Sequence, residues 1–394
     1  MTGRHIGVAE RRARLGVRHR LATGTAGASV AEAAASVVVI HATDPASVFL
    51  QARARMVASS PAGIERELYD ELSVLKMLAM RRTLFLVPLT DVPMVHAAAS
   101  RAIAETERRR TIAMFAEGGV GPDPAALLEE LEKIGLAAVR ERGEATTAEL
   151  RALDPRLDQR ITLARGKSYE GSISVGTKVY FHLALDGRIG RGRPRGTWIA
   201  SQFRWSPIER WLPDGIPEVP VDDARAELVR RWLRAFGPGT RDDIKWWTGW
   251  TVAATRQALA SAGAVEVDLD DGDTGYLLPE DLDPTDPPEP WVALLPALDA
   301  TTMGWKGRDW YLGSYRPALF DTNGNAGPTI WVEGRIVGGW AQRRTGEIVP
   351  QLLEDVGAET RQSIEAEAAR LQQWLGPTRV SGSFPTPLEI ELRS

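Results

Sequence analysis

One order of elements recurs along the chain: helical patterns are followed by two short strand patterns separated by a turn. It is clearest over residues 222–278, where Thr240 and Asp243 form the capping box of a short helix and Gly263 ends the helix after it. Alternating polar and apolar residues then predict two strands, at 265–269 and 276–278. A helix-turn-helix followed by a hairpin is the order of a winged helix.

The same order occurs twice nearer the N-terminus. In the first case, helical patterns precede strand patterns on either side of Arg81-Arg82, which end at Pro88. In the second case, helical patterns precede a cationic loop at 189–196 and a strand at 197–205. We therefore expect an α+β chain with three tandem winged-helix domains.

The pattern changes after an acidic, proline-rich linker at residues 281–290. Short strand patterns follow, including one at 310–312 and a pair joined by a tight turn at Glu333-Gly334, and a terminal helix is expected over 358–375. This part is predicted to be a small β-barrel-like domain with a terminal helix. The expected limits are 1–89 for the first winged helix, 90–213 for a connecting helix and the second, 214–283 for the third and 284–394 for the C-terminal domain.

Composition limits the possible chemistry. The chain of 394 residues has no cysteine, which removes disulfides and thiolate nucleophiles, and none of its five histidines are paired at the spacing of metal ligands. No apolar run is long enough to cross a bilayer. We therefore expect a cytoplasmic protein that acts without metal or cofactor and without a membrane.

Charge is unevenly distributed along the chain. The net charge is −4, yet nine cations lie between residues 161 and 212, against Glu170, Asp186 and Glu209 as the acidic residues of that stretch. The nine are Arg165, Lys167, Lys178, Arg188, Arg191, Arg193, Arg195, Arg204 and Arg210. One face could thus attract phosphates while the molecule as a whole stays acidic.

Basic and aromatic residues in three places are candidates for DNA contacts: Arg108, Arg109 and Arg110 on a long helix; Lys178, Arg188, Arg191, Arg193 and Arg195 in and before the cationic loop; and Trp305, Lys306 and Arg308. The loop arginines would lie along a phosphate backbone or in a minor groove, with a merely solvated loop as the alternative. Trp305 is a candidate for stacking or wedging into DNA, whereas Trp246, Trp247 and Trp250 are expected in the core.

A short polar segment follows a solid apolar run. A helix is expected over residues 31–40, and the polar residues His41, Thr43 and Asp44 follow it. Pro45 prevents the helix from continuing, because proline lacks an N–H group and restricts the residue before it. A second helix then starts at Ala46. These polar side chains would be held rigidly at a helix–helix junction, as functional groups require. The alternative is that His41 and Thr43 only cap the first helix, and Asp44 suits the N-cap of the second.

Together these features resemble the AlkZ/YcaQ-type bacterial DNA glycosylases, over most of residues 15–375. The Asp44-Pro45 junction and the stretch Val-Glu-Gly-Arg-Ile-Val-Gly at 332–338 are the most specific points of resemblance. In that family two polar residues of a Gln-Φ-Gln or Gln-Φ-Asp triplet position the hydrolytic water. The matching residues here are His41 and Thr43, with Ala42 between them, and both polar positions depart from the common pattern.

The resemblance implies a monomeric DNA glycosylase that acts on N7-alkylated purines in damaged duplex DNA, with a link to cross-linking damage. Such a purine is already cationic, so the enzyme must mainly supply a flipped nucleotide and an oriented water. His41 would accept the proton of that water, Thr43 would hold the water, and Asp44 would orient His41 or stabilise the cationic sugar. A non-catalytic winged-helix DNA binder or regulator is the alternative.

Overall fold

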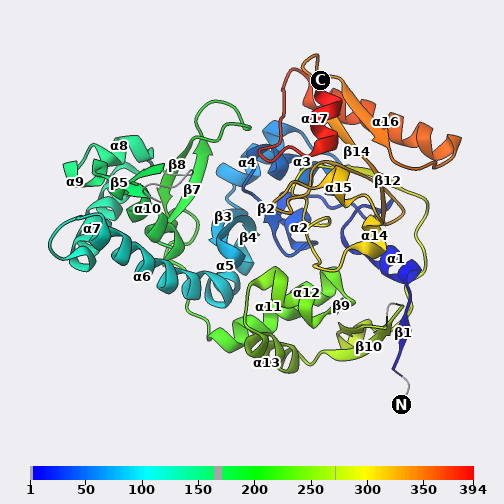
Figure 1. Cartoon of the computed structure of the whole chain (residues 1–394), viewed down its shortest axis with the longest axis horizontal. Coiled ribbons are helices and arrows are strands. Elements are labelled where there is room, and N and C mark those ends of the chain that lie inside the picture. Colours follow the sequence, from blue (N-terminus) through cyan, green and yellow to red (C-terminus); the bar gives the residue numbers. More distant parts are fainter. Residues whose placement is uncertain (1–2, 164–170, 271) are drawn as a thin grey trace.

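The computed structural model describes residues 3–163, 171–270 and 272–394. Two of the predicted cationic residues, Arg165 and Lys167, lie outside these ranges. Three segments of helices with small sheets and a C-terminal segment follow one another along the chain (Figure 1). Among the described residues, no helix is both long and apolar enough to cross a membrane.

The first segment is a sheet covered by helices. Its strands are β2 (Ile40–His41), β3 (Val74–Ala79) and β4 (Thr83–Pro88), in the order β2-β4-β3. Its helices are α1 (Val8–Arg18), α2 (Val30–Ala35), α3 (Pro45–Arg55) and α4 (Pro61–Tyr69). The predicted hairpin is confirmed: β3 and β4 pair antiparallel and are joined by η1 (Met80–Arg82).

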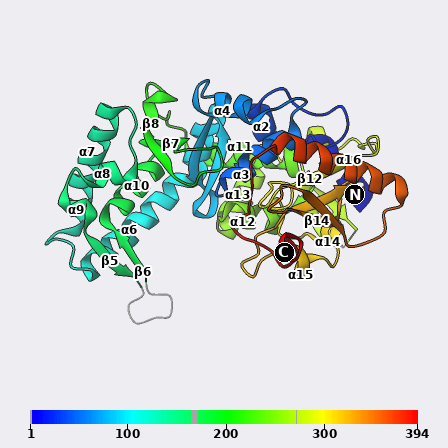
Figure 2. The same ribbon diagram turned by 90° about the horizontal axis from the view of Figure 1, so that it is seen from above.

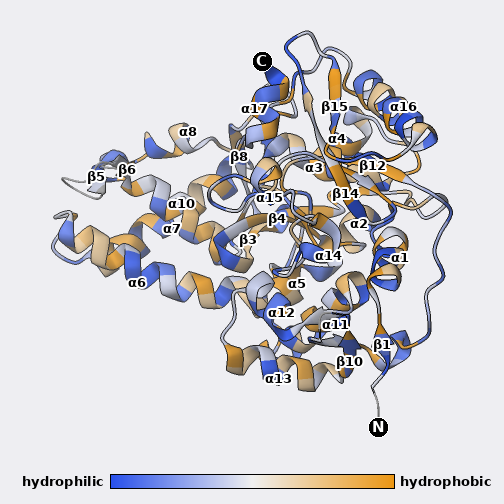
Figure 3. Ribbon diagram, turned by 45° about the vertical axis from the view of Figure 1, so that its right-hand side comes forward, coloured by the Kyte–Doolittle hydropathy of each residue, from blue (hydrophilic) through white to orange (hydrophobic). Residues whose placement is uncertain are grey.

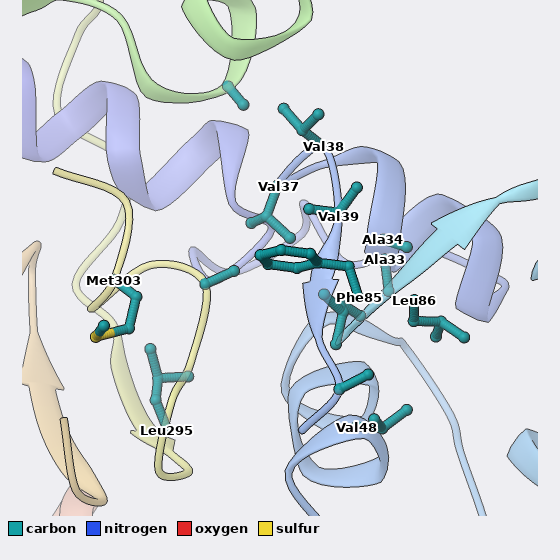
Figure 4. Close-up of a cluster of buried hydrophobic side chains, with 14 of the residues drawn as sticks. Ala33, Ala34, Val37, Val38, Val39, Val48, Phe85, Leu86, Leu295 and Met303 are labelled. Atoms are coloured by element: carbon teal, nitrogen blue, oxygen red, sulfur yellow. The ribbon is translucent and has the colours of Figure 1, made fainter. Parts of the chain in front are cut away.

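The helix predicted over residues 31–40 is wrong in its second half. Helix α2 ends at Ala35, and the valines of 37–39 are buried and lead into β2 instead. Valine is β-branched, which disfavours a helix and suits extended backbone that pairs with a neighbouring strand. Figure 4 shows these valines beside Phe85 of β4, with Leu295 and Met303 of the C-terminal segment on the other side of the cluster.

The second segment projects to one side of the molecule (Figures 1 and 2). Its helices are η2 (Leu89–Asp91), α5 (Val92–Val95), the π-helical η3 (His96–Ser100), α6 (Arg101–Glu117), α7 (Pro124–Arg142), α8 (Thr147–Arg151), α9 (Pro155–Asp158), α10 (Val175–Leu185) and η4 (Ile208–Arg210). Two hairpins complete it, β5 (Arg160–Leu163) with β6 (Gly171–Ser174) and β7 (Ile189–Pro194) with β8 (Phe203–Pro207).

The cationic stretch 189–196 is therefore mostly a strand, where a loop was predicted. Strand β7 pairs antiparallel with β8, with Ile189 opposite Pro207 and Arg191 opposite Trp205. The arginines of β7 are compatible with a strand because their side chains find partners in the protein: the guanidinium of Arg191 lies 4.1 Å from the ring centroid of Phe203. A cation on an aromatic face loses less on leaving water than an unpartnered one.

The third segment matches its prediction closely. It contains α11 (Val221–Phe236), β9 (Gly239–Thr240), α12 (Arg241–Thr248), α13 (Val252–Ala262), β10 (Val265–Leu269), β11 (Thr274–Leu277) and η5 (Pro279–Asp281). The capping box of Thr240 and Asp243 is confirmed. Two strands were not predicted: β9 pairs antiparallel with β11, and β1 (His5–Ile6) pairs parallel with β10, which gives a sheet of order β1-β10-β11-β9.

The C-terminal segment is an open sheet, so the predicted β-barrel is not formed. Strands β12 (Val292–Leu295), β13 (Thr329–Val332), β14 (Arg335–Gln342) and β15 (Ile348–Leu352) pair antiparallel in sequence order without closing. The helices are α14 (Asp309–Leu312), α15 (Arg316–Leu319), α16 (Ala358–Leu375) and α17 (Pro387–Arg393).

Helix α14 replaces the strand predicted at 310–312. The rings of Trp310 and Tyr311 both contact that of Trp305, at centroid distances of 5.1 and 5.6 Å. Successive side chains of a strand point to opposite faces and could not both reach one neighbour.

The first, third and C-terminal segments share one continuous apolar core, while most buried apolar residues of the second segment form a separate cluster. Figure 3 shows apolar strands at the centre and helices α6, α7 and α16 carrying both polar and apolar faces. A buried ion pair also joins the first segment to the C-terminal one: the guanidinium of Arg55 contacts both carboxylate oxygens of Asp299 at 2.7 and 2.9 Å. Neither side chain is exposed.

Candidate functional site

The triplet His41-Ala42-Thr43 runs along the edge of the β3–β4 hairpin. His41 lies opposite Phe85 of β4, and the N–H of Ala42 donates to the carbonyl of Leu84 at 2.8 Å. Since β4 leads back to Thr83 and the turn, the chain beyond His41 heads towards the tip of the hairpin. The hairpin tip, Arg81 and Arg82, is thus the nearest source of positive charge to the triplet along this sheet.

The imidazole of His41 is held neutral. Its ring is partly buried, edge-on to Phe85 at 5.4 Å, and its Nδ1 is buried with no hydrogen-bond partner among the described residues. Burial, followed by the nearby charge of Arg81, lowers the pKa of His41 to about 4. At neutral pH this side chain therefore carries no charge, although it lies close to a guanidinium group.

The backbone of His41 is fixed by a glutamine that the sequence analysis missed. Gln51 of α3 is fully buried; its Nε2 donates to the carbonyl of His41 at 3.0 Å and its Oε1 accepts from the N–H of Ala300 at 3.0 Å. One side chain thus links α3, β2 and the C-terminal segment. A glutamine among the apolar positions of a predicted helix is the signal that could have identified it.

Thr43 and Asp44 have different environments. Thr43 is exposed next to His41. Asp44 is 3% exposed and caps α3, accepting from the N–H of Ser47 at 3.0 Å, as its alternative role predicted. Its second oxygen accepts from the N–H and hydroxyl of Ser383, at 2.9 and 2.8 Å. Both carboxylate oxygens are engaged, so Asp44 does not orient His41; it fixes the end of the triplet to the C-terminal segment.

The hairpin tip touches the third segment. Arg81 and Arg82 both have positive φ, 55° and 61°. The guanidinium of Arg81 lies 4.2 Å from the ring centroid of Trp246 on α12, and that of Arg308 lies 4.9 Å from the same ring. The approach needs a glycine at 249, since a Cβ there would lie 3.1 Å from Cγ of Arg81. Trp247 is buried as predicted, whereas Trp246 and Trp250 are partly buried and pack against the edge of the same core.

A cavity of about 440 Å³ opens beside this contact. The residues that line it include Arg81, Arg82, Arg110, Arg225, Glu107 and Trp250. Glu107 bridges two of the cations, at 3.0 Å from Arg82 and 2.6 Å from Arg110. Arg110, one of the predicted DNA-binding residues, therefore lies at the same cavity as the hairpin tip.

The other predicted cations of α6 differ in their availability. Arg109 is exposed, whereas Arg108 is held by both oxygens of Glu132 and by Asp186, the latter at 2.8 Å. A side chain already committed to two carboxylates is a poor phosphate ligand, because each contact must be broken first.

The predicted basic residues around β7 also differ in their exposure and in their partners. Arg188 and Arg195 are exposed and Lys178 is half-buried. Arg193 is bound by Asp70 at 2.8 Å, and burial lowers the pKa of Arg191 to about 10. Arg193 thus attaches the β7–β8 hairpin to the first segment, and Arg191 packs on β8 within the hairpin, which leaves Arg188 and Arg195 as the exposed arginines of this group.

In the C-terminal segment, the prediction that Trp305 stacks on or wedges into DNA is wrong. Trp305 is 2% exposed and its Nε1 donates to the carbonyl of Phe236 at 3.0 Å. Arg308 is 5% exposed and donates to the carbonyl of Trp305 at 2.8 Å. Lys306 is exposed but lies 3.1 Å from Asp242. Aromatic residues next to cations gave the same sequence signal as a DNA wedge, although here they fill a core.

Comparisons with known proteins agree on the family. The model of the DNA glycosylase AlkZ-like family matches residues 34–374. Among solved structures, Streptomyces sahachiroi DNA glycosylase AlkZ is similar with a TM-score of 0.72 at 20% sequence identity, covering 96% of this chain and 99% of that chain, which shows a common fold. No curated protein matches the chain. Because the family model covers most of its length, the chain belongs to the AlkZ-like family of DNA glycosylases, which are DNA-binding hydrolases of DNA repair.

Proposed function

We propose that this glycosylase hydrolyses the N-glycosidic bond of N7-alkylated purines in duplex DNA, with His41 and Thr43 as the residues that position the attacking water. The proposal includes bulky and cross-linking adducts as substrates and a cytoplasmic monomer, associated with the nucleoid, as the acting form. The observation that carries it is the imidazole of His41, kept neutral beside the cationic hairpin tip.

A neutral imidazole suits this substrate on electrostatic grounds. An N7-alkylated purine is a cation, and its departure leaves an oxocarbenium ion at C1′. Protonated histidine would repel both species, whereas the neutral ring leaves a nitrogen lone pair to accept a hydrogen bond from water. The water oxygen then bonds to C1′ and its proton passes to the imidazole or to solvent.

The pKa of about 4 changes the role expected of His41. A side chain with an ordinary pKa near 6.5 would serve as a general base, but this ring is a weak base. Orientation of the water is therefore its main contribution, which is sufficient because the oxocarbenium ion is strongly electrophilic. Exposed Thr43 would hold the same water through its hydroxyl.

The test is release of the alkylated base from duplex DNA. We expect purified protein to release N7-methylguanine and leave an abasic site, and His41→Ala to slow single-turnover release by about a hundredfold, the size of effect expected when a reacting group loses its positioning. His5→Ala is the matched control, because His5 is an exposed histidine that contacts Asp270 in the third segment's sheet.

The alternative is a DNA binder without activity, and the departure of both His41 and Thr43 from the family's common triplet is the observation that favours it. That alternative would be established if the protein binds duplex DNA but releases no base from DNA that carries methylated or bulky N7 adducts. Release that is unchanged by His41→Ala would remove the triplet from the mechanism while keeping the enzyme.

A further inference from the structure

The cavity beside the hairpin tip is built from three parts of the chain. Arg81 and Arg82 come from the β3–β4 turn, Arg110 from α6 and Arg225 from α11, while Trp250 and Thr251 precede α13. Its volume of about 440 Å³ exceeds that of a single water site and suits a group of several heavy atoms. This chamber differs from a flat basic surface because it is concave, so that a ligand in it can meet side chains from more than one direction.

Positive charge in this chamber is only partly balanced. Glu107 serves both Arg82 and Arg110. Among the described residues, Arg81 has no carboxylate within ion-pair distance, and Arg225 has only Asp222, at 3.9 Å. The Nε of Arg225 is moreover buried without a hydrogen-bond partner. Buried donors and unbalanced charge are costly unless a ligand satisfies them, so the chamber is suited to an anion.

One side of the cavity is apolar. Ala98, Ala99, Ala102 and Ile103 form an apolar side without side-chain acceptors. The Nε1 of Trp250 donates to the carbonyl of Ala98 at 3.1 Å, so that acceptor is already used. A cationic alkylated purine would meet guanidinium groups and few acceptors here. The lesion base therefore does not belong in this chamber.

The start of α13 adds to the same preference. Thr251 caps this helix of 11 residues by accepting from the N–H of Ala254, and both residues line the cavity. The first amides of a helix and the positive end of its dipole favour an anion.

We propose that this chamber binds a phosphodiester of the DNA strand that carries the flipped nucleotide, with Arg225 and Arg81 as its main ligands. The proposal rests on the proposed function and adds a place for the backbone. Arg81 belongs both to the chamber and to the surroundings of His41, so a phosphate held there would fix the target strand against the triplet.

The test combines one variant with a scan of the DNA. A duplex with an abasic-site analogue is prepared with single uncharged methylphosphonate linkages at successive positions, and affinities are measured at several salt concentrations. We expect one position, next to the analogue, to lower affinity about tenfold in the unchanged protein and to have no effect in Arg225→Gln. The slope of log affinity against log salt should fall by about 1 in that variant.

Two further variants guard against a loss of structure. Arg344→Gln removes an exposed arginine from the turn after β14 and should leave both slope and scan unchanged. Ala254→Glu adds a carboxylate at the third position of α13, where it completes a capping box with Thr251. It should keep or raise thermal stability and still weaken DNA binding, which a folding defect could not explain.

The outcomes separate this proposal from the previous one. The phosphodiester site alone is overturned if the protein still releases alkylated base but no methylphosphonate position has an effect on affinity that Arg225→Gln removes. Inorganic phosphate in the millimolar range that binds through Arg225, with a flat scan, overturns it in favour of a free phosphate site. A coupled position in a protein without base release supports the site and contradicts the proposed activity.

Discussion

At the scale of single residues, His41 shows how an environment changes the use of a side chain. Residue type alone suggests a group that titrates near neutrality. Burial beside Phe85 and the proximity of Arg81 shift its pKa to about 4. The shift also affects stability: the folded chain resists protonation at His41 while the unfolded chain does not, so stability falls as pH drops through the interval from 6.5 towards 4 and is retained above it.

The same shift predicts the pH dependence of base release. We expect single-turnover release to be nearly constant from pH 8 to about 6 and to fall only below that, because His41 stays neutral until the pH approaches its lowered pKa. Bound phosphates will raise this pKa somewhat, so the inflection should lie between about 4 and 6. Rates are measured with the uncatalysed release subtracted. An inflection at 6.5 or above would show that His41 is not the group that titrates.

Residue types predicted part of this site and missed the rest. The N-cap role of Asp44 followed from its place before Pro45, because capping is a local interaction. Its bond to Ser383 and the contact of Gln51 with Ala300 join positions hundreds of residues apart, and no local pattern encodes them. The prediction that Trp305 contacts DNA failed for the same reason, since the Phe236 against which it packs lies in another segment.

At the scale of elements, the β3–β4 hairpin is the part on which both proposals depend. Its two strands and its turn were predicted from alternation and from the Arg81-Arg82 pair. The contact of its tip with α12 was not predicted, because it depends on the docking of two segments. Gly249 makes that contact possible: its φ is 77° and its Cα faces the side chain of Arg81.

Gly249→Ala should therefore disturb DNA binding more than stability. Positive φ costs an alanine about 1–2 kcal/mol, and the new methyl group would lie 3.1 Å from Cγ of Arg81 and shift that side chain on Trp246. We expect duplex affinity to fall severalfold. Gly263→Ala is the control: its φ is 73°, it also follows a helix, and a Cβ there meets nothing within 4 Å. Equal affinities in the two variants, measured by titration at one salt concentration, would show that the hairpin tip does not contact DNA.

Other elements show where local patterns succeed. The capping box at Thr240 was correctly predicted, since it is completed within one turn of helix. Three other elements were predicted wrongly, because a neighbour decides their conformation. The residues after α2 pair with β4, strand β7 pairs with β8, and helix α14 packs against the ring of Trp305. A short element with mixed propensity takes the structure of whatever it packs against.

At the scale of the whole molecule, the pair Arg55–Asp299 joins the first segment to the C-terminal one. Arg55 also donates to the hydroxyl of Thr301 and to the carbonyl of Gln51, at 2.8 and 3.0 Å. The same Thr301 hydroxyl lies 2.8 Å from Nδ1 of His19, the C-cap of α1. This buried network lies next to the glutamine that fixes His41, so the position of the candidate site depends on how these segments dock.

Asp299→Asn should consequently destabilise a defined part of the chain. The change leaves Arg55 buried without its charge partner, a loss of about 3–5 kcal/mol, whereas Asp309→Asn, at an exposed position of α14, should cost less than about 0.5 kcal/mol. Because the second segment has its own apolar cluster, the loss should be uneven. Hydrogen exchange followed by mass spectrometry should show reduced protection in α3, β4 and β13, with α7 and α10 little changed. Equal loss of protection in α7 and α10 would mean that the two clusters unfold as one unit, and that docking of the second segment, which carries Arg110, is tied to the same buried ion pair.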